Sequence, residues 1–126
     1  MKATDTQIGG THYKSLAIQP IEFITAIRCS FIQGCIIKYI SRYKNKNGAE
    51  DIKKCIHYAE LAIQLGDKRR CKDNDLSLNM NRYILKNKLT IMHRRIITKT
   101  VYNDYASVIR YCKELLQLEY PESAKL

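Results

Sequence analysis

Residues 31–65 hold the feature that most limits how this chain can fold: two stretches with helical spacing of apolar residues, separated by the turn-forming pair Asn47-Gly48. Ser30 and Gln33 form a capping box ahead of the first stretch, and Gly66 ends the second. We therefore expect an all-α protein, with a helical hairpin core over residues 31–65 and further helices flanking it. The spacing of three and four runs through Ile32, Ile36, Tyr39, Ile40 and Tyr43, and then through Ile52, Cys55, Ile56, Ala59, Ala62 and Ile63.

The mouth of this hairpin is strongly cationic. Glu50 and Asp51 fall in the first turn of the second helix, where carboxylates complement the helix dipole. A cluster of this kind favours a phosphate-bearing ligand, whereas the alternative is that the basic residues only solvate helix faces. Six basic residues surround the turn: Lys38, Arg42, Lys44, Lys46, Lys53 and Lys54.

A short helix is expected before the hairpin. Pro20 suits its first position, and a helix from there to about residue 28 would bury Ile21, Ile24 and Ile27. Gln19 would then act as its cap or contribute to a binding site.

The second half of the chain shows weaker patterns. Residues 67–79 are polar and basic and indicate a linker. Residues 80–102 favour a helix, with a short β-hairpin over 82–101 as the alternative because β-branched residues are frequent there. A last helix is expected after Asn103, which would cap it. We accordingly divide the chain into a helical domain at 1–66, a basic linker at 67–79 and a helical extension at 80–126.

Charge and cysteine usage narrow the class of protein. The formal net charge is +10 at pH 7, and the excess is spread over both halves, which indicates a polyanionic or phosphorylated partner. The five cysteines have no C-x-x-C spacing, so zinc and a disulfide framework are not expected. No long apolar run or apolar leader is present in the sequence, so we expect a cytoplasmic protein without a membrane partner.

Familiar catalytic patterns are missing. The sequence has no Walker A motif, and its three histidines lie in unrelated contexts. Helical pyrophosphatases hold magnesium through E-x-x-E pairs on facing helices, but the adjacent Glu50 and Asp51 offer only a single acidic pair here. Binding is therefore favoured over metal-dependent hydrolysis. His12, Tyr13 and Lys14 follow a Gly-Gly pair and could donate hydrogen bonds to a phosphate or a base.

Three motifs together resemble a small phage-encoded domain family of unknown function. They are H-Y-K at residues 12–14, I-Q-P-I-E-F at residues 18–23 and the pattern G-x-x-x-K-Y-x-x-R-Y-K-x-K-x-G-x-E-D-x-K-K at residues 34–54. The resemblance covers about residues 9–65. It departs at Ser41, where relatives carry an aromatic residue, and at Cys35, where asparagine is frequent. Some members of that family are nucleotide kinases, including a coliphage enzyme that phosphorylates deoxynucleoside monophosphates without a Walker loop.

The resemblance and the charge pattern lead to one main hypothesis. We expect a cytoplasmic protein of the infected host cell that captures a nucleotide, or a cyclic or dinucleotide signal made in antiviral defence, without turnover. The alternatives are a nucleotide kinase that holds magnesium through Glu50 and Asp51, and sequence-independent nucleic-acid binding. A homo-oligomer is expected because a second copy could cover the apolar face of the hairpin. The candidate ligand-binding residues are His12, Tyr13, Lys14, Gln19, Lys38, Arg42, Tyr43, Lys44, Lys46 and Lys54.

Overall fold

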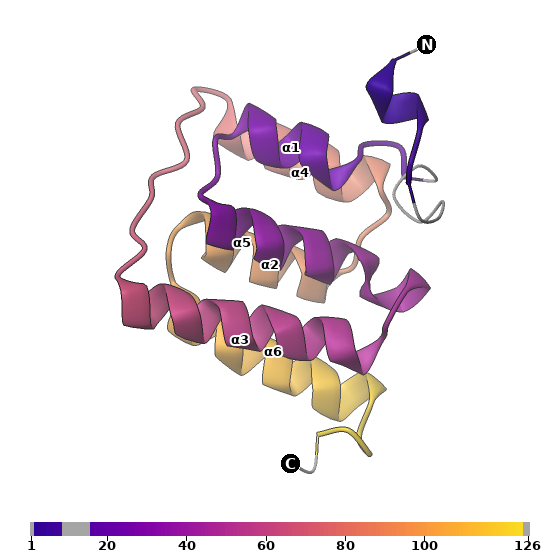
Figure 1. The fold of residues 1–126 in the computed structure, drawn as a ribbon, viewed down its shortest axis with the longest axis vertical. Helices are drawn as coiled ribbons and strands as arrows, with labels where there is room; N and C mark the ends of the chain where they lie inside the picture. Colours follow the sequence, from indigo (N-terminus) through magenta and orange to yellow (C-terminus); the bar gives the residue numbers. More distant parts are fainter. Residues whose placement is uncertain (1, 9–15, 125–126) are drawn as a thin grey trace.

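All regular structure in the described part of the chain is helical. The computed structural model describes residues 2–8 and 16–124 (Figure 1). The prediction of an all-α fold is confirmed, and the alternative of a β-hairpin over 82–101 is wrong because these residues lie in the fourth and fifth helices and their connection. The α-helices are α1 (Pro20–Ala26), α2 (Phe31–Arg42), α3 (Ala49–Leu65), α4 (Leu76–Lys86), α5 (Ile91–Val101) and α6 (Tyr105–Glu119), with 3-10 turns η1 (Ala3–Asp5) and η2 (Tyr43–Asn45).

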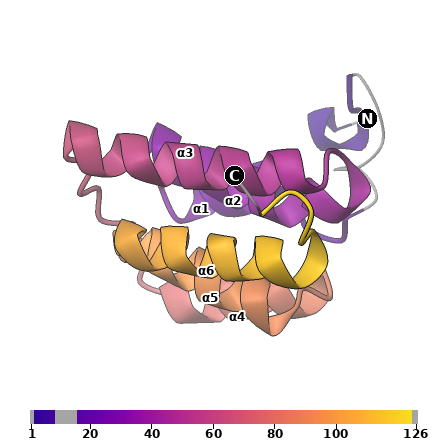
Figure 2. The ribbon, with the colours of Figure 1, turned by 90° about the horizontal axis from the view of Figure 1, so that it is seen from below.

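The six α-helices form two layers of three. In Figure 2, α1, α2 and α3 make one layer, and α4, α5 and α6 make the other. Across the layers, α1 packs on α4, α2 on α5 and α3 on α6. The connection over residues 67–75 returns along one edge, from the end of α3 to the start of α4 (Figure 1). None of the described helices is both long and apolar enough to cross a membrane.

The second layer repeats the local structure of the first. In the α1–α2 and α4–α5 connections, a residue with positive φ lies two positions before the N-cap of the next helix. In both helices the N-cap hydroxyl accepts a hydrogen bond from the third helical N–H. The α1–α2 and α4–α5 segments therefore share one local structure. Equivalent residues are 60 positions apart: Arg28 and Lys88, Ser30 and Thr90, and Gln33 and His93.

The repeat extends into the core. Phe23 and Tyr83 occupy equivalent positions and stack on each other, with ring centroids 4.4 Å apart. Helices α2 and α5 present equivalent buried isoleucine pairs, at 36–37 and 96–97, to one continuous core. The apolar face of the hairpin, which we expected a second copy to cover, is therefore covered by α5 and α6 of the same chain.

Two local predictions are wrong. The N-cap of α6 is Asp104, whose carboxylate accepts a hydrogen bond from the Ser107 N–H, while Asn103 lies in the connection with φ of 62°. Helix α1 buries Phe23 and leaves Ile21 62% exposed, because the face of α1 that contacts the second layer is the one opposite to Ile21. Burial of Ile27 is confirmed, and Ile24 is partly buried.

His93 is a buried ionisable residue between the layers. Its ring stacks on Tyr43 with centroids 5.4 Å apart, and its Nδ1 accepts a hydrogen bond from the Thr90 N–H. Burial, reinforced by the nearby Lys44, lowers the pKa of His93 to about 4. The imidazole of His93 is therefore neutral in the folded protein at neutral pH. Protonation of Nδ1 would also remove the acceptor of the hydrogen bond from the Thr90 N–H at the start of α5.

We expect this histidine to make stability depend on pH. An unfolded histidine has a pKa near 6.5, so the unfolded chain binds a proton as pH falls from about 6.5 to about 4 and the folded state does not. Stability should fall by about 3 kcal/mol over this window. His93→Gln keeps the capping acceptor, as Gln33 does in the equivalent position, and should remove this contribution. The exposed His57→Gln should leave it unchanged. Urea titrations between pH 4 and 7.5 would measure both, and an unaltered slope in His93→Gln would contradict the assignment.

Candidate functional site

A buried ion pair joins the two helices of the hairpin at its mouth. Asp51 is 0% exposed, and its two carboxylate oxygens each accept a hydrogen bond of 3.1 Å from the Arg42 guanidinium, from Nε and Nη2. The Asn47 N–H also donates to Asp51, at 3.3 Å. The bidentate pair fixes the end of α2 against the start of α3, and it determines how the neighbouring cations are placed.

Tyr39 is the centre of a cationic cluster on the outer surface of α2 and α3. The ammonium of Lys38 lies 4.5 Å from the Tyr39 ring centroid, the guanidinium carbon of Arg42 at 4.6 Å and the ammonium of Lys54 at 5.0 Å. Tyr58 of α3 stacks beside the same ring at 5.9 Å. We call Tyr39, Lys38, Arg42 and Lys54 the Tyr39 cluster. Its only buried counter-charge among these contacts is Asp51, so the cluster carries a net positive charge.

An apolar cavity of about 250 Å³ adjoins this cluster. Lys38 forms part of its wall and is also one of the cations over Tyr39. Gly34 allows α1 to approach α2 closely, since a Cβ at this position would lie 3.0 Å from a methyl carbon of Ile24. The cavity is lined by Gln19, Pro20, Ile21, Ile24 and Lys38.

The structure brings four of the predicted site residues together. Gln19 and Lys38 line the cavity, and Lys38, Arg42 and Lys54 surround Tyr39. Gln19 is also the N-cap of α1, and its amide donates a hydrogen bond to the carbonyl of Thr4, which ties the segment 2–8 to this side of the molecule.

Three other predicted residues lie apart from this cluster. Tyr43 is fully buried and its hydroxyl donates to Glu119 at 2.8 Å, so the prediction that it contacts a ligand is not supported by its position. Lys44 is exposed beside the Tyr43 ring, near His93 rather than Tyr39. Lys46 is exposed at the turn. His12, Tyr13 and Lys14 lie outside the described residues.

The acidic residues at the mouth do not suit a magnesium ion. Both oxygens of Asp51 are used by Arg42 in a fully buried position, and the adjacent Glu50 is exposed. Over residues 2–8 and 16–124, no three His, Cys, Asp or Glu side chains converge as a metal site. Since magnesium needs several oxygen ligands, the two predicted carboxylates do not fit the metal that a kinase would require.

An aromatic row continues from the cluster along the outer face of the hairpin. Tyr39 stacks on Tyr58, and Phe31 packs edge-on against Tyr58 with centroids 6.5 Å apart. Phe31 is 79% exposed, so the row ends on the surface. Phe31, Tyr58 and the cavity residues Ile21 and Ile24 were not among the predicted site residues. The spacing of residues 31, 35, 38–39 and 42 along one helical face could have revealed part of the row.

The second layer keeps the packing of the first but not its cluster. The positions equivalent to Lys38, Tyr39 and Arg42 are occupied by Thr98, Lys99 and Tyr102. The isoleucine pairs and cap hydrogen bonds are retained in both layers, so the packing between the layers does not depend on Lys38 and Tyr39.

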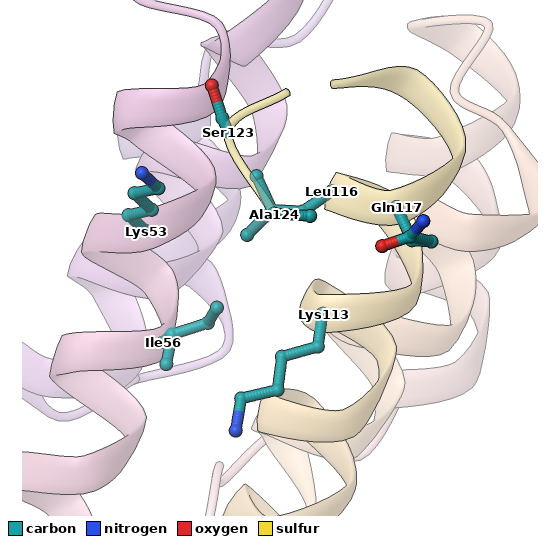
Figure 3. Close-up of a pocket in the computed structure, with 7 residues that line it drawn as sticks. All are labelled: Lys53, Ile56, Lys113, Leu116, Gln117, Ser123 and Ala124. Carbon is teal, nitrogen blue, oxygen red and sulfur yellow. The ribbon is translucent and has the colours of Figure 1, made fainter. Parts of the chain in front are cut away.

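A larger groove lies between α3, α6 and the C-terminal turn. It has a volume of about 410 Å³, with Ile56 and Leu116 among its lining residues (Figure 3). Lys53 and Lys113 stand on opposite walls, and their ammonium groups point toward opposite ends of the groove. These two cations do not converge, and none of the described residues that line the groove is aromatic, so it suits a nucleotide less well than the Tyr39 cluster.

Breaking the buried ion pair should unfold the hairpin mouth. Asp51→Asn leaves the Arg42 guanidinium without its charge partner, and we expect a loss of about 3 kcal/mol in the free energy of unfolding. The matched control is Glu50→Gln, which removes an exposed carboxylate one residue earlier and should change stability by less than about 0.5 kcal/mol. Chemical denaturation followed by circular dichroism would measure both, and equal effects would rule out a structural role specific to Asp51.

Comparison with known proteins identifies a family match over residues 9–60. No curated protein and no solved structure matches the chain. Residues 9–60, which contain α1, α2 and most of α3, match the sequence profile of a family described as a protein of unknown function (DUF3310).

Proposed function

We propose that this protein binds a nucleotide or a nucleotide-derived signalling molecule at the Tyr39 cluster and holds it without turnover. The observation that carries the proposal is the dual position of Lys38, which lines an apolar cavity and also belongs to a cluster of cations around an aromatic ring. A nucleotide combines an apolar ring system with charged phosphates. The apolar cavity suits the ring system, and the cations of the Tyr39 cluster suit the phosphates.

The volume of the cavity indicates which part of such a ligand would enter it. The cavity of about 250 Å³ is smaller than typical pockets for whole ligands, which span about 300–1,000 Å³. One ring system would enter between Pro20, Ile21 and Ile24, while the phosphates remain outside on Lys38 and Lys54. Arg42 would contribute its positive charge while its guanidinium remains hydrogen-bonded to the Asp51 carboxylate. His12, Tyr13 and Lys14 precede Gln19 by only a few residues and are candidates to complete the site.

Capture is favoured over phosphoryl transfer because of the charges at the site. Transfer requires neutralisation of the moving phosphoryl group and a positioned metal or base. The described cations supply the first requirement, but the carboxylates Glu50 and Asp51 do not supply the second. In a phage-encoded protein, tight capture would withdraw a nucleotide signal made by host defence.

Calorimetry with mononucleotides and cyclic dinucleotides would test the site. Lys38→Met should weaken binding about 10- to 100-fold, since a charge-assisted hydrogen bond contributes roughly 1.5–3 kcal/mol. Tyr39→Leu should also weaken binding, because it removes the ring that gathers Lys38, Arg42 and Lys54 at one place. Lys86→Met, on the exposed side of α4 in the other layer, is the control and should bind as the unmodified chain does. Equal affinity in Lys38→Met and in the unmodified chain would locate the site elsewhere.

Product analysis separates capture from the kinase alternative. The protein would be incubated with deoxynucleoside monophosphates, a nucleoside triphosphate and magnesium, and the nucleotides separated by chromatography. Capture predicts that the ligand is recovered unchanged after heat denaturation of the protein. Formation of diphosphates that depends on Lys38 would instead establish the kinase.

Single-stranded nucleic acid is the second candidate ligand, and the aromatic row favours it. Phe31, Tyr58 and Tyr39 offer successive ring surfaces beside the cations, as single-strand binding surfaces do. Salt distinguishes the two ligands, because contacts to many phosphates make affinity fall steeply as salt rises. Filter binding of an oligonucleotide at two salt concentrations, with Phe31→Ala as the row-end variant, would show a steep dependence only for the second candidate.

A further inference from the structure

Cys29 and Cys71 form a close thiol pair at the edge of the molecule. Their Sγ atoms are 4.0 Å apart, although the residues are 42 positions apart in the sequence. Cys29 lies in the α1–α2 connection and Cys71 in the helix-free segment between α3 and α4. Both are partly exposed, whereas Cys35, Cys55 and Cys112 are buried in the core. The pair therefore differs from the other cysteines in both position and access.

The surroundings of the two thiols are polar and unequal. The Cys71 thiol lies 3.7 Å from the Gln33 Oε1, and the Arg69 guanidinium is tied to the Arg28 carbonyl nearby. The hydrogen bond from Cys29 lowers the pKa of the Cys71 thiol, with a further contribution from Arg69, while the same bond raises the pKa of Cys29. Asp67 acts against ionisation of both thiols. Cys71 is thus the better nucleophile and Cys29 the proton donor beside it.

We propose that Cys29 and Cys71 are a redox pair that forms a reversible disulfide under oxidation by a hydroperoxide. The Cys71 thiolate attacks the peroxide oxygen, which gives a sulfenic acid on Cys71 and, from hydrogen peroxide, one water molecule after protonation. The Cys29 sulfur then attacks the Cys71 sulfur, the S–S bond forms, and the sulfenic oxygen leaves as a second water that takes up the Cys29 proton. Two thiols are oxidised and one peroxide is reduced.

The geometry requires only a small movement. A disulfide needs the sulfur atoms about 2.05 Å apart, so they must approach by about 2 Å. The segment 67–75 has no helix, and residues 68, 69, 70 and 72 around Cys71 are exposed, so a local backbone shift can bring Cys71 toward Cys29. The amide of Gln33 donates to the Arg69 carbonyl, at 3.0 Å, and keeps the segment close to Cys29 before the reaction.

The disulfide would covalently join the α1–α2 connection to the segment that leads from α3 to α4, at one edge of the molecule. Cys29 follows the end of α1, the helix that contributes Pro20, Ile21 and Ile24 to the cavity. Closing a long loop in the unfolded chain stabilises the folded state, and we expect a melting temperature about 5–10 °C higher in the oxidised protein. Reduction with dithiothreitol should reverse the shift.

Peptide mapping after peroxide treatment tests the pairing. The full chain is oxidised under native conditions, remaining thiols are alkylated, and the protein is cut with chymotrypsin, which separates Cys29 from Cys35 by cleavage after Phe31. The expected product is one linked pair that contains Cys29 and Cys71 and disappears on reduction. Cys35→Ser and Cys112→Ser should retain both the linked pair and the shift in melting temperature.

Two variants keep the proposal open to refutation. Cys29→Ser should abolish the linked pair and the stabilisation, and should allow Cys71 to oxidise further to a sulfinic acid. Cys71→Ser should leave Cys29 unreacted at the same peroxide concentration. A linkage from Cys71 to Cys35, sulfinic acid on Cys71 of the unmodified chain without any linked pair, or no reaction of either thiol would each overturn the assignment.

Discussion

The bidentate pair between Arg42 and Asp51 determines the geometry on which the candidate site depends. A carboxylate with no exposure is costly to bury unless its oxygens are fully engaged, and here two guanidinium bonds and a backbone N–H engage them. The pair fixes the angle between α2 and α3 at the turn. Lys54, one turn along α3 and 3.9 Å from Asp51, is thereby held over the same ring as Arg42.

The positive charges of the Tyr39 cluster are only partly neutralised by the protein. Three cations within about 5 Å of one ring repel each other, and the quadrupole of Tyr39 and the charge of Asp51 offset this repulsion only in part. A bound phosphate would relieve this repulsion, which is the electrostatic reason for the ligand that we propose. This repulsion destabilises only the surface around Tyr39, because the layers are held together by apolar packing elsewhere.

Comparison of the two layers shows which features are needed for packing and which occur in one layer alone. Both layers use the same connection, the same type of cap and the same isoleucine pair, which are features required for packing. Differences are concentrated where one layer faces solvent and where polar groups bridge the layers. Gln33 bonds to Arg69, Thr100 and Asn103, and so connects the first layer to the returning segment and to α5. Its counterpart His93 packs against Tyr43 instead.

Short-range residue spacing was enough to predict the local structure of the first half of the chain. The hairpin, its Ser30–Gln33 box, Pro20 at the start of α1 and the left-handed Gly66 at the end of α3 were all predictable. Which polar residues face each other depends on how the helices pack, and residue spacing does not contain that information. Arg42 was predicted to contact a ligand, and Asp51 to hold magnesium only in the kinase alternative, but the structure pairs their side chains. Tyr43, a predicted ligand contact, is buried, whereas Tyr39, predicted only as part of the apolar spacing, lies among the cations. The repeat was also not predicted from the sequence. It is preserved in backbone geometry and in the pattern of burial, and many different side chains can satisfy both.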